Sequence, residues 1–241
     1  MLFRSGKMNG FVQDFLSSLP EVDGFILKNR SPSCGIKDVK IYGAGDKSFV
    51  KGKGAGFFGR KVLESHPIAA IEDDGRLRHI RLRQDFLTRL FMHARLRQVW
   101  DVKSLTDFHA RHKYILMSYS PGDLKRLGVI AANQEGWGFR EVFDGYKTVL
   151  GEALGKNPTT QKHINVLNHL LGYFKKDLNT KEKKLFLDKI EEYRDERITL
   201  SVLTSMIESW NKRSEKPYLS ESRYLDPYPR QLVMIDDTCM T

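Results

Sequence analysis

The sequence has little cysteine and no long apolar segment. Its 241 residues contain two cysteines, Cys34 and Cys239, which lie far apart in the chain, so we expect two free thiols. No run approaches the roughly 20 apolar residues that a membrane-spanning helix requires. The start, MLFRSGKMNGF, lacks the apolar core of a signal peptide. The sequence therefore predicts a cytoplasmic protein with no membrane partner.

Acidic side chains are scarce in one stretch of a chain whose formal charge is already +10. Residues 76–97 contain seven arginines and a single acid, Asp85. A solvated helix face explains most charge runs. Arginine without lysine favours phosphate recognition instead, because the planar guanidinium binds phosphate oxygens bidentately. Three arginines of this run are the candidate RNA contacts here: Arg81, Arg89 and Arg95.

Two compositional halves follow each other along the chain. Residues 1–80 read as α/β, with a helix over 9–19, a buried strand over 22–28 and a short strand over 39–43. Residues 81–99 are expected to form a basic connecting helix, and residues 100–241 an all-α domain. The predicted fold class is thus an α/β remnant followed by an all-α helical domain, predominantly α overall.

Five helices are predicted in the second half, four of them from residues that cap helix N-termini. Side-chain oxygens at these positions accept hydrogen bonds from the first free backbone amides. Three prolines near the end of the chain disfavour regular structure there. The predicted openings are Ser104 with Asp107, Ser120 before Pro121, Thr159 or Thr160, and Asn179 with Glu182; the fifth helix covers 199–210.

The segment KNRSPSCGIKD, residues 28–38, carries Cys34 directly after the predicted buried strand. Open α/β sheets bind ligands at the carboxyl ends of their strands. Pro32 would stiffen this loop and Gly35 would permit close approach. A buried structural cysteine is the alternative, but polar neighbours on both sides argue against it. Three nearby cations would favour a thiolate: Lys28, Arg30 and Lys37.

The first half resembles the C-terminal half of the thiouracil desulfidase family. The matching motifs are GFILKNRSPSCG, VKIYG, FFGRKVLESHP and EDDGRL, within residues 10–98. The resemblance implies a [4Fe-4S] cluster held by three cysteines, with one iron open to the sulfur of a thiolated pyrimidine. By position, Cys34 corresponds to the family's last cluster ligand and is the candidate metal-binding and catalytic residue. Ser31 corresponds to the serine expected to face the substrate.

The chain departs from this family in its cluster ligands. The family's two other cysteines and an acidic residue lie upstream of the SPSCG segment, in a part that this sequence lacks. Because an iron–sulfur cluster normally needs three or four thiolates, Cys34 alone cannot hold one. Cys239, in the C-terminal tail, cannot replace two ligands. We expect an N-terminally shortened and inactive form, whose cluster would need a missing N-terminal segment or a second subunit.

The second half is similar to the YbgA-like helical domain. FHARHKYILMSYSP, KHINVLNHLLGYFKK and PYLSESRYLDPYP carry the similarity, between Trp100 and Leu232. In fusions of this layout the resemblance implies removal of sulfur from 4-thiouridine in tRNA, with the helical domain helping to hold the RNA.

Polar side chains on two predicted helices of this half are the candidate RNA contacts. Buried hydrogen bonds between helices explain such residues equally well. A zinc site at the histidines is disfavoured, since no HExxH or Cys-His spacing is present. Tyr218, Tyr224 and Tyr228 could stack on bases or pin the tail to the core. The candidates are His109, Arg111, His112, Lys113, Lys162, His163, Asn165, His169 and Lys176.

Three functions are consistent with these features. The first is tRNA-directed sulfur removal from thiolated uridine. The second is a non-catalytic nucleic-acid-binding module of YbgA type, in which the basic surface carries the function. The third is a redox or sulfur-carrier protein that uses Cys34 as a nucleophile.

Overall fold

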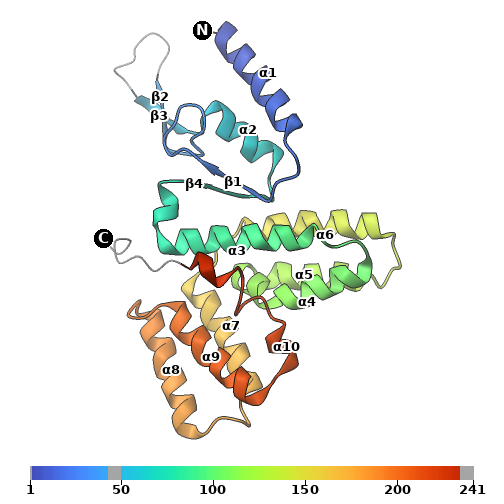
Figure 1. The fold of residues 1–241 in the computed structure, drawn as a ribbon, viewed down its shortest axis with the longest axis vertical. Helices are drawn as coiled ribbons and strands as arrows, with labels where there is room; N and C mark the ends of the chain where they lie inside the picture. Colours follow the sequence, from blue (N-terminus) through green and yellow to red (C-terminus); the bar gives the residue numbers. More distant parts are fainter. Residues whose placement is uncertain (1, 43–49, 234–241) are drawn as a thin grey trace. The chain divides into compact units, whose positions relative to one another are not determined.

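The computed structural model describes residues 2–42 and 50–233, with side chains from residue 10 onward. The chain divides into two compact units, one reaching to Arg95 and the other running Leu96–Arg230 (Figure 1). Over the described ranges, four short strands lie in the first unit and helices dominate the second. The predicted α/β beginning, followed by an all-α domain, is confirmed. Within the same ranges, none of the helices is both long enough and apolar enough to cross a lipid bilayer.

The strands of the first unit form two separate pairs. Strands β1 (Gly24–Leu27) and β4 (Ala70–Asp73) run parallel, in a register that sets Gly24 beside Ala70 and Leu27 beside Asp73. Strands β2 (Val39–Tyr42) and β3 (Val50–Gly54) run antiparallel. Because β1 and β4 are parallel, the loops that leave them emerge at the same edge.

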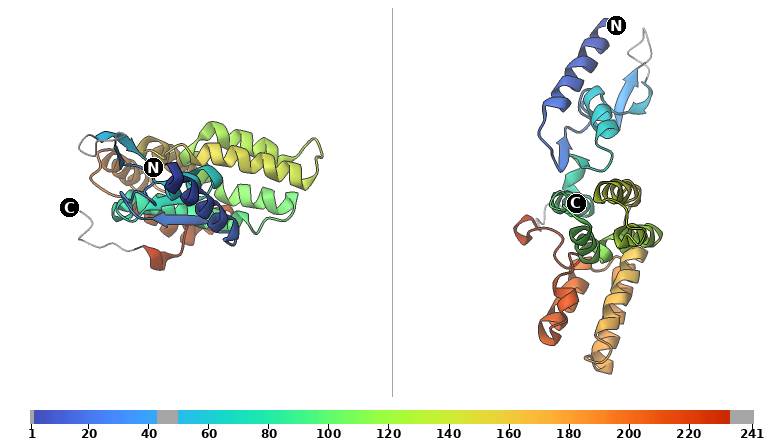
Figure 2. Two further views of the ribbon diagram at one scale, coloured as in Figure 1. Left: turned by 90° about the horizontal axis from the view of Figure 1, so that it is seen from above. Right: turned by 90° about the vertical axis from the view of Figure 1, so that its right-hand side faces the viewer.

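Three helices accompany these strands. Helix α1 (Leu2–Ser18) lies beside α2 (Phe57–Ser65) (Figure 1, Figure 2), and the rings of Phe15 and Phe58 meet at a centroid distance of 5.8 Å. After the short 3-10 turn η1 (Arg76–Arg78) comes α3 (Ile80–Leu96). A Cβ on Gly24 would lie 2.4 Å from the Ala70 carbonyl oxygen and 2.8 Å from a methyl of Leu90. Glycine in β1 thus permits the close packing of the paired strand and of α3.

The second unit begins with three packed helices, α4 (Val102–Tyr119), α5 (Pro121–Ala132) and α6 (Phe139–Leu154). Helix α6 is missing from the predicted set, because two glycines interrupt its sequence and Gly138 offers no capping side chain. Its apolar positions nevertheless recur at helical spacing. The fully buried side chains of this layer include Leu105, Leu116, Leu127, Tyr146 and Leu150.

Helix α4 begins one turn earlier than predicted. Its N-cap is Asp101, which accepts a hydrogen bond from the Ser104 amide at 2.7 Å, while the Ser104 hydroxyl accepts from the Asp101 amide at 3.0 Å. Ser104 is therefore the third helical residue of a capping box and not the cap itself. The other predicted caps are confirmed: Ser120 for α5, Thr159 for α7, and Asn179 with Glu182 for α8.

Four further helices complete the second unit: α7 (Thr160–Tyr173), α8 (Thr180–Arg194), α9 (Leu200–Ser214) and the short α10 (Pro217–Ser220). Their core is aromatic, since the Trp210 ring lies 5.7 Å from that of Phe174 and 5.0 Å from that of Phe186. The prediction that the proline-rich tail has no regular structure is wrong for 217–220, where Pro217 opens α10. Proline fits there because the first helical position needs no amide hydrogen.

Candidate functional site

The loop that carries Cys34 leaves the carboxyl end of β1, as predicted, but the expectation that this strand is buried is wrong, since Ile26 is 61% exposed. The partner strand β4 ends beside it, and Asp74 links the loops that follow the two strands. Lys28 Nζ lies 2.5 Å from Asp74 Oδ2, and the Asn29 amide donates to Asp74 Oδ1 at 2.8 Å. The hydrogen bond from Lys28, together with that from Asn29, lowers the pKa of the Asp74 carboxyl. Lys28 therefore links the ends of the two strands, and its charge is paired with that of Asp74.

Ser31 shapes this loop with both its backbone and its side chain. Its hydroxyl oxygen accepts hydrogen bonds from the amides of Cys34 at 3.1 Å and Ser33 at 3.3 Å. Its carbonyl accepts from the Gly35 amide at 2.8 Å. A hydroxyl has two acceptor lone pairs and one proton. With both lone pairs turned to the loop, Ser31 is left with a proton to donate to a ligand.

The cysteine loop is fixed to the N-terminus of α2 by backbone hydrogen bonds. The first amides of a helix have no partner within the helix. Here these amides donate to carbonyl oxygens of the loop and of Gly35, so the chain itself occupies the N-terminal end of this helix. The pairs are Gly56 N to Gly35 O at 2.8 Å, Phe57 N to Pro32 O at 3.3 Å, Phe58 N to Ser33 O at 2.9 Å and Gly59 N to Ser33 O at 3.1 Å.

Two glycines at the start of α2 make this close approach possible. A Cβ on Gly56 would lie 2.4 Å from the Ser33 carbonyl oxygen. A Cβ on Gly59 would lie 2.4 Å from the Gly35 oxygen and 2.7 Å from the Cys34 oxygen. All these contacts are with backbone, which cannot rotate aside. The GFFG sequence thus places the backbone of Cys34, and no other residue type fits at either glycine without moving the loop.

Cys34 itself is a half-buried free thiol. It is the one cysteine among residues 2–42 and 50–233, because Cys239 lies outside the described residues. No group of three or more His, Cys, Asp or Glu side chains able to hold a metal occurs within those ranges. A [4Fe-4S] cluster needs three or four thiolates. The donors of this chain therefore do not fit such a cluster.

Buried acids at the end of β4 lie at the same edge of the strand pair and were not predicted as site residues. Glu72 and Asp73 are 5% and 2% exposed. Arg76 pairs with Glu72 through Nε at 2.7 Å and Nη2 at 3.2 Å, and its amide donates to Asp73 Oδ1 at 2.8 Å. The Glu72 hydrogen bond raises the pKa of Arg76. The signal in the sequence is an acid four residues before an arginine, across the turn at Gly75.

The arginine-rich run divides between internal and external positions. Arg76 is held by Glu72, and Arg89 Nε lies 3.1 Å from Asp85 Oδ2, with 18% of the Arg89 side chain exposed. Arg95 is half-buried, whereas Arg81 is exposed. Part of the positive charge that suggested phosphate binding is thus neutralised within the first unit.

Two candidate histidines of α4 make contacts inside the second unit. His109 Nδ1 lies 3.1 Å from the Tyr146 hydroxyl, and burial lowers the pKa of His109. His112 is 1% exposed, lies against the Phe108 ring and has Nδ1 2.7 Å from the Phe108 carbonyl oxygen. His109 thus connects α4 to α6, whereas His112 lies against Phe108 of its own helix.

The next two candidates lie at the start of α7 and are also held internally. Lys162 Nζ donates to the Tyr119 carbonyl at 2.6 Å and to the Asn157 carbonyl at 2.9 Å. His163 Nδ1 lies 2.9 Å from the Tyr224 hydroxyl. Burial, assisted by the charge of Lys162, lowers the pKa of His163 to about 4. His163 is therefore neutral at pH 7 and pins the tail to α7.

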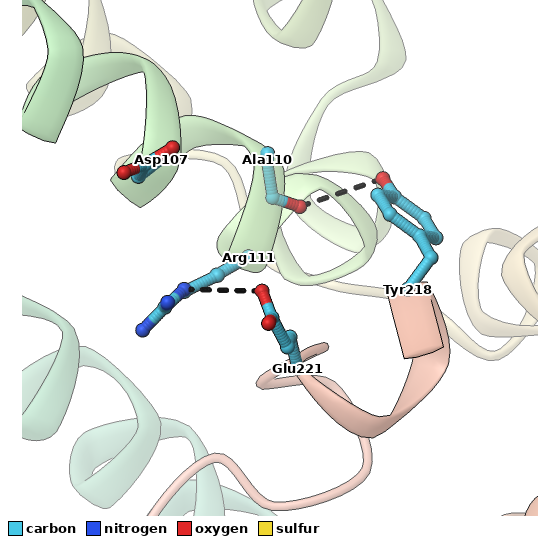
Figure 3. A pocket seen from close by; sticks show the side chains of 5 residues that line it. All are labelled: Asp107, Ala110, Arg111, Tyr218 and Glu221. Carbon is cyan, nitrogen blue, oxygen red and sulfur yellow. Dashed lines mark hydrogen bonds and ion pairs between the residues drawn. The ribbon is translucent and has the colours of Figure 1, made fainter. Parts of the chain in front are cut away.

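The remaining candidates present their side chains at the surface. Arg111, Asn165, His169 and Lys176 are exposed and Lys113 is half-buried. Arg111 borders a shallow pocket of about 260 Å³, a volume that includes the open solvent at its mouth, and its Nε lies 3.6 Å from Glu221 Oε2 (Figure 3). The other residues that line this pocket are Asp107, Ala110 and Tyr218.

Comparison with known proteins divides the chain in the same order. Residues 4–74 match the family described as 2-thiouracil desulfurase, and residues 113–229 match the family described as Protein of unknown function (DUF1722). The "Uncharacterized protein YbgA" of Escherichia coli (strain K12) is 25% identical over 128 residues, which cover 53% of this chain and 76% of that protein. No solved structure matches. The chain is thus a fusion of a thiouracil-desulfurase-like segment and a YbgA-like helical domain.

Proposed function

We propose that this protein acts in tRNA-directed removal of sulfur from thiolated uridine, with the helical unit binding the RNA. The observation that carries the proposal is the presence of both matches on one chain, with Cys34 held in a loop that α2 fixes in place. In the net reaction water replaces the sulfur, so that the thiocarbonyl becomes a carbonyl and hydrogen sulfide leaves. The formal charge of +10 supports binding to a polyanion.

The residues of this chain have limited roles in that reaction. The geometry suits Ser31 as a hydrogen-bond donor to the substrate and Cys34 as one thiolate. Two cysteines in the whole sequence are too few for a [4Fe-4S] cluster. The proposal therefore includes a second subunit or further segment that supplies the other thiolates. Alone, the chain is expected to bind tRNA with little catalysis.

Two measurements on the full chain test this proposal. The first is tRNA affinity by fluorescence anisotropy over a range of salt concentrations, with duplex DNA and heparin as competitors. We expect tRNA to bind more tightly than either competitor. If heparin competes as well as tRNA, the binding is generic electrostatics and the tRNA-directed role fails.

The second measurement is anaerobic reconstitution with iron and sulfide, followed by incubation with tRNA that contains 4-thiouridine. We expect little cluster absorption and little hydrogen sulfide from this chain alone. A full cluster spectrum with sulfur release would refute the need for outside ligands. The same assay with Cys34→Ser is the matched control, since any release that depends on the Cys34 thiol must disappear in that variant, which keeps Cys239.

The alternative function is a non-catalytic nucleic-acid-binding module. The misfit between the cysteine count and a cluster favours it. It predicts tRNA binding that is indifferent to 4-thiouridine and no sulfur release even when cell extract is added. Sulfur release that depends on Cys34 in such an extract would exclude it.

A further inference from the structure

Three tyrosines from three different helices meet at the surface of the second unit. They are Tyr114 of α4, Tyr173 of α7 and Tyr218 of α10, and we call them the tyrosine cluster. Tyr114 is buried, and its hydroxyl donates to the Tyr173 hydroxyl at 2.9 Å. The rings of Tyr173 and Tyr218 lie 6.0 Å apart at 18° to each other, and these two residues are 39% and 38% exposed. Two nearly parallel aromatic rings are thus presented to solvent over a buried third one.

The cluster is held in place before any ligand binds. Asn211 fixes both ends of α10, because its Nδ2 donates to the Ser220 hydroxyl at 3.0 Å and its Oδ1 accepts from the Lys216 amide at 3.1 Å. Leu219, beside Tyr218, is 1% exposed. The chain beyond α10 is anchored by the Arg223 amide, which donates to the Arg111 carbonyl at 2.9 Å. A ring that is already ordered loses little conformational entropy when a ligand stacks on it.

The groups around the cluster include hydrogen-bond donors and acceptors beside the aromatic rings. Tyr218 also lines the pocket that contains Arg111 and Glu221, so a donor and an acceptor line the same pocket as an aromatic side chain (Figure 3). Lys113 Nζ lies 5.8 Å from the centre of the Tyr114 ring. Carboxylates in the pocket oppose a phosphate there, whereas base edges offer N–H donors that carboxylates accept.

Exposed polar residues continue the surface along α7. Asn165 and His169 precede Tyr173 by eight and four residues, so all three lie on one face of the helix. Lys175 and Lys176 follow Phe174, just beyond the end of α7, and are exposed. These cations favour a polyanion beside the aromatic rings.

We propose that Tyr173 and Tyr218 form a stacking platform for an unpaired base of RNA, with Arg111 and Glu221 contacting the edge of that base. This inference rests on the proposed RNA-binding function of the helical unit and specifies how that unit binds. Single-stranded bases stack on aromatic side chains with about 1–3 kcal/mol per base, largely independent of sequence. Paired bases cannot reach such a platform without leaving the duplex. The platform therefore selects loops and unpaired ends.

The test uses the full chain and two ligands, a single-stranded RNA that contains 2-aminopurine and the same RNA in a duplex. Wild type is expected to bind the single strand more tightly and to quench the 2-aminopurine fluorescence. Tyr218→Leu should lower single-strand affinity by about fivefold to a hundredfold and abolish the quenching. Tyr218→Phe should retain both, since it keeps the ring and loses a weak hydrogen bond to the Ala110 carbonyl at 3.5 Å.

Matched variants separate stacking from charge and from folding. Trp137→Leu removes an aromatic side chain that is 54% exposed and lies outside the cluster, so it should leave affinity unchanged. Tyr218→Leu should leave the dependence of affinity on salt concentration unchanged, whereas Lys175→Gln with Lys176→Gln should reduce it. Circular dichroism of each variant verifies that the helical unit is folded.

The outcomes distinguish this inference from the function on which it rests. Suppose that the wild type binds RNA and that the two variants Tyr218→Leu and Tyr173→Leu bind it equally well. The platform is then refuted, while RNA binding stands. Equal affinity of wild type for the strand and the duplex refutes it too. If wild type binds neither ligand nor tRNA, both the platform and the proposed function fall.

Discussion

The two units position their polar residues in different ways. In the first unit, the cysteine loop is placed by backbone hydrogen bonds to α2 and by glycines that let backbones touch. In the second, helices are placed by apolar side chains and by capping residues, and a Cβ at Gly122, Gly145 or Gly172 would meet no atom within 4 Å beyond its own stretch of helix. The first unit should therefore be sensitive to added atoms and the second to lost side chains.

The largest effect is expected from Gly59→Ala. The new methyl would lie 2.4 Å from the Gly35 oxygen, so the cysteine loop must leave α2, at a cost of about 3 kcal/mol or more. Hydrogen exchange should show lost protection in α2, and Cys34 should be alkylated faster. Gly145→Ala in α6 is the control and should stabilise by about 1 kcal/mol. If both variants changed the free energy of unfolding equally, the two units would not differ in their sensitivity to an added methyl group.

His163 should make the second unit sensitive to acid. Its pKa is about 4 in the folded protein and near 6.5 when unfolded, so stability is fully present above pH 6.5 and is lost as the pH falls towards 4. The loss should reach about 3 kcal/mol. His163→Gln does not titrate and should flatten this part of the pH profile, as measured by urea unfolding at pH 4 to 7. An unchanged pH profile in the variant would contradict the assignment.

Asp123 should also make the stability of the second unit depend on pH, but at lower pH values than His163. It lies at the start of α5 and is bound by Lys156, Ser120 and Arg126; the Lys156 hydrogen bond is the main cause of a pKa of about 2. Because this pKa is depressed, its contribution of about 2 kcal/mol is present above pH 4 and is lost as the pH falls towards 2. Asp123→Asn should lose that stability at pH 7. Asp144→Asn, at an exposed ion pair with Lys147, is the comparison and should change little.

The smallest loss of stability is expected from a substitution at a helix cap. Asp101→Ala removes the acceptor for the Ser104 amide and should destabilise by about 1 kcal/mol. Asp107→Ala, three residues beyond Ser104, tests the cap that the sequence suggested and should have little effect. Chemical denaturation of both variants gives the comparison. A larger loss from Asp107→Ala would restore the predicted helix start.

Several features of the fold follow from the sequence because their causes are local. Ser120 before Pro121, and Asn179 with Glu182, identify helix starts through hydrogen bonds that span three residues. Strand β1 is recognisable from its apolar run, and its loop must follow it. Helix α6 escaped prediction because its glycines weaken local propensity, while tertiary packing of residues such as Tyr146 and Leu150 stabilises it.

The features of the candidate site can be divided in the same way, into those with local causes and those that depend on tertiary packing. The order of residues alone shows that one loop carries Ser31 and Cys34, that the chain has two cysteines, and that arginine dominates residues 76–97. Three contacts become visible only in the folded chain: Gly59 touches the loop, His163 lies against Tyr224, and Tyr173 meets Tyr218. These contacts join residues far apart in the chain. Their formation depends on how whole helices pack, which no local pattern of residues encodes.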